Sequence, residues 1–165
     1  MRKIVILASV VFILIIAAGL VFKGAKKQTA GDLIPTPTII NTNLKTFKSS
    51  SAMDFTIQTP RSYEITEKMG SVIVSSPVGK IYINVNGTNF SDLVNYLNDL
   101  EIKNKFTLSN KKDLIIATYP AIAGLVEKDK FYFIYVQGIV YSISTKNVDL
   151  YSDLDQIAQS FKYTP

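Results

Sequence analysis

The feature that most constrains this chain is an unbroken apolar run near its N-terminus. Residues Ile4 to Phe22 read IVILASVVFILIIAAGLVF, in which Ser9 is the one clearly polar side chain. As a helix, this run would span about 28 Å, close to the roughly 30 Å hydrocarbon core of a bilayer. A buried core helix is seldom apolar on every side at this length. The run predicts one transmembrane anchor over residues 4–22, preceded by a tail of residues 1–3.

A cleaved secretory signal is the alternative interpretation of this run. Signal peptides have an apolar region of about 7–15 residues and a small-x-small cleavage site. The run here is longer, and the nearest candidate site, Gln28-Thr29-Ala30, has the wrong residue at its first position. The absence of cysteine excludes a lipoprotein signal. We therefore favour a retained signal-anchor.

The charges around the run explain the excess of basic residues in the chain. Five of the 18 basic residues flank it: Arg2, Lys3, Lys23, Lys26 and Lys27. The 13 basic residues that remain balance the 13 acidic ones, all of which lie after position 27. A neutral domain lacks the positive excess that binds phosphate backbones, so no nucleic-acid partner is predicted. The numbers of basic residues on the two sides of the run are nearly equal, so the positive-inside rule favours neither orientation strongly. The short N-terminal tail, however, resembles that of bacterial signal anchors. We expect a cell-membrane protein with its folded domain outside the cytoplasm.

The residue types that are missing limit the chemistry. The chain contains no histidine and no cysteine, which excludes Ser-His-Asp and Cys-His nucleophilic sites and zinc sites built from imidazole or sulfur. The eight glycines are scattered and form no phosphate-binding loop. No catalytic, cofactor-binding or metal-ligating residue is predicted.

Residues 23–50 differ in composition from residues 51–165. They are rich in Thr, Ser, Asn and Lys, and they contain Pro35 and Pro37. Proline removes backbone donors and favours extended chain. This composition predicts a flexible linker, although Leu33-Ile34 and Ile39-Ile40 remain candidates for packing on the domain or forming an edge strand.

Residues 51–165 alternate between strand and helix patterns. Period-two runs predict strands at residues 53–59, 63–67, 71–75, 80–85, 105–108, 114–119, 121–127, 130–136 and 139–145. Turns are expected at Lys128-Asp129 and Gln137-Gly138. A first helix is predicted after the cap residue Asn89, fading near residues 101–103, and a second over residues 149–162. Hairpin-length connections dominate, so the fold class is α+β: a mostly antiparallel sheet with two helices packed on one face.

Two segments carry a resemblance to a known family. Phe55-Thr56-Ile57-Gln58-Thr59-Pro60-Arg61-Ser62-Tyr63 resembles the opening strand, proline and aromatic residue of PsbP-like domains, and Ile157 to Lys162 resembles the end of their last helix. The chain departs from that pattern with Tyr63 where Trp is usual and Ser62 where Gly is common. The resemblance implies an α+β domain that binds or supports an assembly without catalysis.

Tyrosines are the candidate interaction residues. Tyrosine suits half-buried strands, and it is also enriched at protein interfaces. Five of them fall on predicted strands and are candidates for an interaction surface: Tyr63, Tyr82, Tyr132, Tyr135 and Tyr141.

The acidic residues are weaker candidates. Asp149, Asp153 and Asp155 could bind a cation, but acidic residues also favour the first turn of a helix. Other carboxylates could in principle act as a catalytic pair, but a solvated face explains them better: Glu64, Glu67, Asp99, Glu101 and Glu127.

Three functions remain open at this point. The first is a membrane-anchored extracytoplasmic domain, without a catalytic centre, that binds another envelope protein or supports an assembly. The second is a small-ligand or lipid-binding domain with an apolar pocket between the sheet and the helices, lined by residues such as Phe55, Leu97, Phe133 and Phe161. The third is an enzyme that uses carboxylates or a metal, which requires two acidic side chains that converge in a cleft.

Overall fold

The structure is a computed structural model that describes residues 43–165. The predicted tail, the predicted anchor at residues 4–22 and the linker as far as residue 42 lie outside the described residues. Within residues 43–165, no helix is both long enough and apolar enough to cross a membrane.

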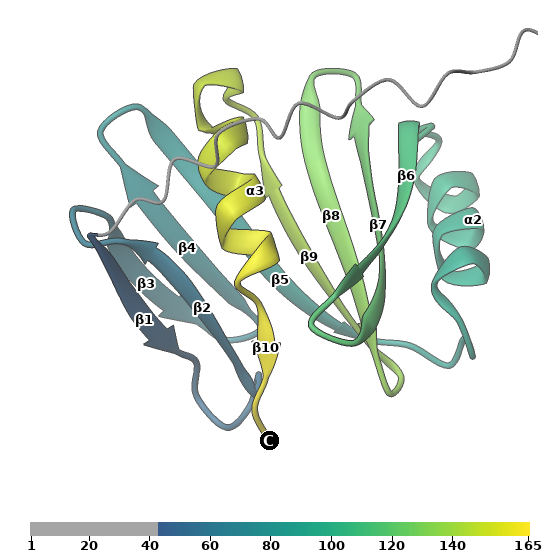
Figure 1. The fold of residues 1–165 in the computed structure, drawn as a ribbon. Coiled ribbons are helices and arrows are strands. Elements are labelled where there is room, and N and C mark those ends of the chain that lie inside the picture. The colour runs from purple at the N-terminus through teal and green to yellow at the C-terminus, as the bar shows by residue number, and fades with distance from the viewer. Residues whose placement is uncertain (1–42) are drawn as a thin grey trace, which may run out of the picture. The chain divides into compact units, whose positions relative to one another are not determined.

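The described residues form two antiparallel sheets and two α-helices, which confirms an α+β fold that is mostly antiparallel (Figure 1). The elements in chain order are β1 (Leu44–Lys48), β2 (Phe55–Pro60), β3 (Glu64–Lys68), β4 (Ser71–Ser76), β5 (Gly79–Gly87), α2 (Leu93–Asn104), β6 (Ser109–Ile116), β7 (Tyr119–Val126), β8 (Asp129–Val136), β9 (Ile139–Thr145), the 3-10 turn η1 (Val148–Leu150), α3 (Tyr151–Gln159) and β10 (Lys162–Tyr163).

The larger sheet has seven strands in the order β3-β4-β5-β9-β8-β7-β6. The chain builds β3, β4 and β5 as a meander, crosses through α2 to the far edge at β6, and returns strand by strand to β9 beside β5. The smaller sheet has the order β1-β2-β10, so its central strand pairs with the last strand of the domain.

Strand β1 corrects the predicted domain boundary. The composition places residues 44–48 in the linker, but they pair along their full length with β2, from Leu44 opposite Pro60 to Lys48 opposite Thr56. Phe47 packs against Phe55, with ring centroids 6.3 Å apart. The sequence does not indicate this strand because its composition is polar. An edge strand can be polar, since few of its side chains are buried.

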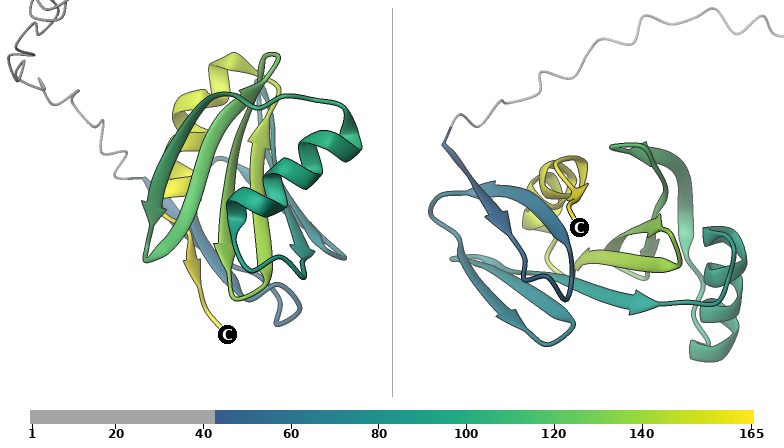
Figure 2. Two further views of the ribbon diagram at one scale, coloured as in Figure 1. Left: turned by 90° about the vertical axis from the view of Figure 1, so that its right-hand side faces the viewer. Right: turned by 90° about the horizontal axis from the view of Figure 1, so that it is seen from below.

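The helices lie on opposite faces of the seven-stranded sheet, which corrects the prediction that both pack on one face (Figure 2). Successive residues of a strand point to opposite faces. On β8, Tyr132, Ile134 and Val136 join a cluster that contains the buried side of α3, whereas Phe133 joins a second cluster with α2. We call the α3 side the inner face and the α2 side the outer face.

Both faces are held by apolar packing. On the inner face, α3 packs against β2 and β9, and Leu154, Ile157 and Phe161 are fully buried. On the outer face, the predicted stripe of α2 is confirmed at Leu93 and Leu97, which pack against β7 and β8. Since strand β8 is covered on both faces, its nearly continuous apolar sequence is explained.

Two turns show how the hairpin register is fixed. Gln137 and Gly138 have φ angles of 48° and 83°, the left-handed pair that a two-residue hairpin loop requires, and they close Val136 onto Ile139 as predicted. The preceding turn is at Glu127 and Lys128, one residue earlier than predicted, with Glu127 at φ 55°.

Three further predictions of element boundaries were wrong. Residues 109–113, which lie between the strands predicted at 105–108 and 114–119, are part of the edge strand β6, where all five are exposed. Helix α2 is capped by Asp92, whose carboxylate accepts a hydrogen bond from the Asn95 amide at 2.8 Å, and not by Asn89. The last helix ends at Gln159, because residues 162–163 pair with β2 instead.

Candidate functional site

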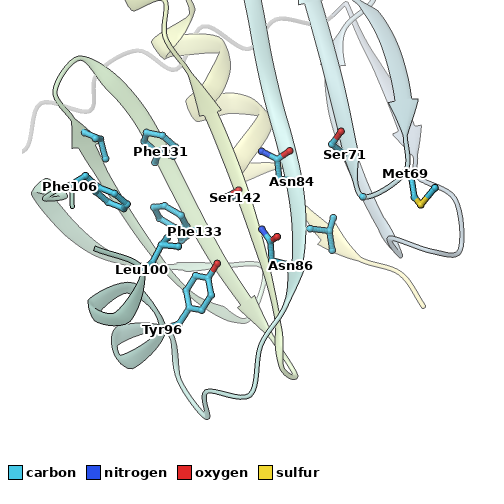
Figure 3. Close-up of a pocket in the computed structure, with 13 residues that line it drawn as sticks. Met69, Ser71, Asn84, Asn86, Tyr96, Leu100, Phe106, Phe131, Phe133 and Ser142 are labelled. Carbon is cyan, nitrogen blue, oxygen red and sulfur yellow. The ribbon is translucent and has the colours of Figure 1, made fainter. Parts of the chain in front are cut away.

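A groove of about 600 Å³ lies on the outer face, where α2 leaves the sheet uncovered (Figure 3). Helix α2 contacts β7 and β8, whereas β4, β5 and β9 continue beyond it without a covering helix. We call this hollow the α2 groove. Its volume falls in the range of small-ligand sites in proteins, about 300–1,000 Å³.

One wall of the α2 groove is apolar. It is made by α2, the loop between α2 and β6, β7 and β8, through Leu100, Phe106, Val126, Phe131 and Phe133. The rings of Phe131 and Phe133 are nearly parallel, with an interplanar angle of 4° and centroids 5.6 Å apart. They form the aromatic end of the groove (Figure 3).

The floor and the opposite wall carry polar, uncharged side chains, together with Met69 and Val85. Strand pairing places Phe133 opposite Ser142, Ser142 opposite Asn84, and Asn84 opposite Ser71. This row crosses four strands and changes from aromatic on β8 to hydroxyl and carboxamide on β9, β5 and β4. Asn86 lies two residues after Asn84 on the same face, about 7 Å further along the strand.

The polar side chains of the groove are available for binding. Within residues 43–165, the side chains of Ser71, Asn84, Asn86 and Ser142 make no hydrogen bond. The hydroxyl of Tyr96 on α2 also lines the groove without a hydrogen-bond partner among these residues. Burial, with a smaller contribution from the charge of Asp99, raises the pKa of Tyr96.

Two loops at the ends of α2 hold the apolar wall in place. Before the helix, the Tyr135 hydroxyl donates to the Phe90 carbonyl at 2.9 Å, and Phe90 meets the Tyr96 ring edge to face. After the helix, Glu101 accepts a hydrogen bond from the Leu108 amide at 2.5 Å and pairs with Lys111 at 2.9 Å. These contacts fix the loop that carries Phe106.

Close packing at Gly124 holds the second loop against β7. A Cβ at this position would lie 2.6 Å from the Leu108 side chain and 2.9 Å from the Ser109 carbonyl. Leu108, which is 3% exposed, therefore needs a residue without a side chain beneath it. Leu108 and Gly124 together bring the start of β6 close to the sheet.

The five tyrosines predicted as an interaction surface are dispersed. Tyr141 is fully buried and Tyr132 is 6% exposed, both on the inner face, so neither contributes to a surface. Tyr63 packs at the edge of the inner cluster, and Tyr135 packs on the outer face below the β5–α2 loop. Only Tyr82, 37% exposed on β5, points from the outer face beside the α2 groove.

Most of these tyrosines bind other elements through their hydroxyl groups. Tyr63 donates to Asp153, Tyr132 donates to Asp155 at 2.8 Å, and Tyr141 donates to the Met53 carbonyl at 2.8 Å. Burial, and then the hydrogen bond to Asp153, raise the pKa of Tyr63 to about 12. Burial raises the pKa of Tyr141 to about 12 and also raises that of Tyr132, to which the hydrogen bond with Asp155 adds.

The acidic residues near α3 serve different partners. Asp153 accepts from Tyr63, whereas Asp155 accepts from Tyr132 and pairs with Lys130 at 2.5 Å. Within residues 43–165, no group of three acidic side chains is arranged to hold a metal ion. The other carboxylates are also separated: Glu101 pairs with Lys111, Asp99 with Lys103, and Glu67 accepts from the Ser50 amide.

The pocket residues named from the sequence are core residues in the structure. Phe55 and Phe161 are fully buried on the inner face, where their rings stack with centroids 5.8 Å apart, and Leu97 is 2% exposed on the outer face. Phe133 alone of the four lines the α2 groove. Sequence reasoning missed Asn84 and Asn86, although their alternation with the core residues Ile83 and Val85 marks them as outer-face residues.

Comparisons with known proteins add a distant structural likeness. No known protein family matches the chain, and no curated protein matches it. A crystal structure of a protein from Bacteroides thetaiotaomicron is similar over 74% of this chain, with 14% identity and a TM-score of 0.49. The match spans 49% of that protein, so this chain corresponds to about half of its length.

Proposed function

We propose that this chain is a non-enzymatic binding protein at the cell envelope and that the α2 groove is its binding site. Residues 4–22 anchor it in the membrane as a single span, and the folded domain lies outside the cytoplasm. The observation that carries the binding role is the groove itself, a hollow of about 600 Å³ with an aromatic wall facing unpaired polar side chains. Such a combination gives apolar contact area together with a few orienting hydrogen bonds.

The proposal also includes the family relationship that the sequence suggests. The resemblance to PsbP-like domains implies binding or support of an assembly without catalysis, and the neutral lining of the groove agrees with a binding role. Holding the domain at the membrane would keep the groove close to its ligand.

A protein partner in an envelope assembly is the second candidate occupant of the groove. It is favoured by Met69, which is fully exposed at the β3–β4 turn and lies at the edge of the groove, and by the exposed Tyr82 on the same face. Exposed apolar side chains around a hollow are typical of protein interaction sites.

Site-specific photo-cross-linking in cells tests the proposed site. A photoreactive phenylalanine analogue replaces Met69 at the groove, and in a matched control it replaces Ile115, which is 71% exposed on edge strand β6. Cross-linking at position 69 but not at position 115 is expected. The mass of the adduct distinguishes a protein partner from a small ligand. Equal adducts at both positions, or none at position 69, would contradict the proposal.

Protease added to intact cells tests the topology separately. The domain should be removed if it lies outside the cytoplasm, whereas a cytoplasmic control protein stays intact. Full protection of the domain, in cells where a known external protein is cleaved, would show that the orientation is wrong.

A further inference from the structure

We infer that the α2 groove binds an uncharged saccharide, with one apolar ring face against the phenylalanine wall and its hydroxyl groups on the asparagine side. This inference rests on the proposed function and names the class of ligand for the same site. It is drawn from the charge, the shape and the hydrogen-bonding capacity of the groove.

The first argument concerns charge. The lining of the groove contains no acidic, lysine or arginine side chain, and its one titratable group is the phenol of Tyr96, which is neutral at pH 7 like any ordinary tyrosine. Burying a charged group without a partner is strongly unfavourable. A phosphate, carboxylate or ammonium group in the ligand would find no counter-charge in this groove, so the ligand is uncharged where it touches the protein.

The second argument concerns the two unlike walls. Phe106, Phe131 and Leu100 offer apolar surface, which favours a ligand face made of C–H groups. Asn84, Asn86 and Ser142 lie across from them, with their side chains unpaired within residues 43–165. The ligand must therefore be apolar on one side and rich in hydrogen-bonding groups on the other.

The third argument concerns the kind of polar group. A carboxamide presents two N–H donors and an oxygen acceptor close together, and a hydroxyl group both donates and accepts. Neighbouring hydroxyls of a sugar ring match both capacities at once. Because Asn84 and Asn86 are about 7 Å apart along β5, they reach successive polar groups of one ligand.

An alkyl chain fits the groove less well. A lipid tail would cover the phenylalanine wall, but it would leave the carboxamides of Asn84 and Asn86 without partners, which costs the free energy of desolvating each one. A nucleoside is the closer competitor, because a base has flat faces and pairs with asparagine. It is included as a probe for that reason.

Saturation-transfer NMR on the full chain in phospholipid nanodiscs tests the inference. The probes are cellotetraose and chitotetraose, which are neutral and differ in an acetamido group, together with adenosine and empty nanodiscs. We expect saturation of the axial C–H protons on one face of the sugar rings for at least one oligosaccharide. Absence of transfer to both, or transfer to adenosine alone, would overturn the inference.

Variants tie the signal to the groove. Phe131→Ala should abolish the transfer, and Asn86→Ala should weaken binding about fivefold, the value of one lost hydrogen bond. The matched controls Ile115→Ala and Asn89→Ala, both exposed and outside the groove, should bind as the unaltered chain does. Because Asn86 is exposed on the strand surface, its variant keeps the test valid if Phe131→Ala fails to fold.

The outcomes separate the ligand class from the proposed function. If the oligosaccharides fail but cross-links persist at position 69, the saccharide inference is wrong and the groove is still a binding site. If the oligosaccharides bind equally well to Phe131→Ala and Asn86→Ala, binding occurs elsewhere and the inference is wrong. If both the oligosaccharides and the cross-links fail, the proposed function is wrong as well.

Discussion

At the scale of single residues, the polar groups inside this domain divide into those that bind a partner and those that do not. Tyr141 is fully buried, and its hydroxyl donates a hydrogen bond to the Met53 carbonyl, 88 residues away in sequence. A buried tyrosine usually finds such a partner. The partner comes from another part of the fold, so a sequence shows the tyrosine but not what it binds. For this reason the sequence pattern alone leaves these tyrosines as candidates either for sheet packing or for an interaction surface.

Two buried threonines offer a matched test of this division. Thr145 donates to the Lys80 carbonyl at 2.8 Å and accepts from the Asn147 amide at 3.2 Å, whereas Thr59 Oγ1 has no partner within residues 43–165. Thr145→Val should lower the free energy of unfolding by about 1–3 kcal/mol, because the Lys80 carbonyl and the Asn147 amide each lose a hydrogen-bond partner. Thr59→Val should leave it unchanged or raise it. Urea unfolding of the two variants measures both values, and equal losses would contradict this assignment.

The raised tyrosine pKa values predict sensitivity to alkali. Tyr63 and Tyr141 keep their protons to a pKa of about 12 in the folded protein, above the ordinary value of about 10. The unfolded chain therefore loses these protons first, and stability that is complete below pH 10 should fall between about pH 10 and 12. Denaturation midpoints measured across this range should decline less in the double variant Tyr63→Phe/Tyr141→Phe. Tyr82→Phe, at an exposed side chain, is the control and should behave as the unaltered protein does.

At the scale of elements, the sequence patterns predict which segments form strands more reliably than they predict the position of each strand in the sheet. Strands β4, β5, β8 and β9 are predicted within two residues, because each buries apolar residues on at least one face and so alternates or is apolar throughout. Strand β1 and the first half of β6 were not predicted, because they lack the alternation of apolar and polar residues. Edge strands can carry Lys and Ser and still keep their backbone pairing.

The α2 groove was not predictable from any one element. It depends on α2 covering only two of the seven strands and on the register that sets Asn84 opposite Ser142 and Ser142 opposite Phe133. The sequence contains the relevant signal, the alternation of Asn84 and Asn86 with the core residues of β5. It does not show that β8, which lies beyond β9 in the sheet, supplies phenylalanines on the same face.

The link between α2 and β6 is expected to control the apolar wall of the groove. Glu101 is 16% exposed in its side chain and holds the Leu108 amide, with support from Lys111. These hydrogen bonds lower the pKa of Glu101, so the stability they add is present above its ordinary pKa and is lost as the pH falls through the lowered value. Glu101→Ala should cost about 1–3 kcal/mol of unfolding free energy, because the Leu108 amide loses its partner.

Hydrogen exchange would locate that loss. The amide of Leu108 should exchange faster in Glu101→Ala, while amides of β4 keep their protection. Asp99→Ala removes an exposed pair with Lys103 on the same helix and serves as the control, with little expected change. Unchanged protection of Leu108 in Glu101→Ala would show that the loop is held by other contacts.

At the scale of the whole domain, the two sheets and α3 close around one inner core, and β1 belongs to that structure. A chain that begins at residue 51, the predicted domain boundary, would lose the strand that pairs with β2 and the contact of Phe47 with Phe55. We expect residues 51–165 to be less stable than residues 43–165 and more prone to associate through the exposed edge of β2. Thermal unfolding and sedimentation of both fragments measure this. Equal melting temperatures would show that β1 contributes nothing.

The placement of β2 between β1 and β10 sets an order of events during synthesis. A ribosome delivers β2 about a hundred residues before it delivers Lys162 and Tyr163, the residues that pair with it. Similarly, one edge of β5 stays unpaired until β9 is synthesised, since α2 and three strands come between them in the sequence. The first half of the domain therefore leaves the ribosome with two unpaired strand edges and an apolar face. Because exposed strand edges and apolar surface favour association with other proteins, we expect a nascent chain stalled before residue 160 to remain bound to chaperones.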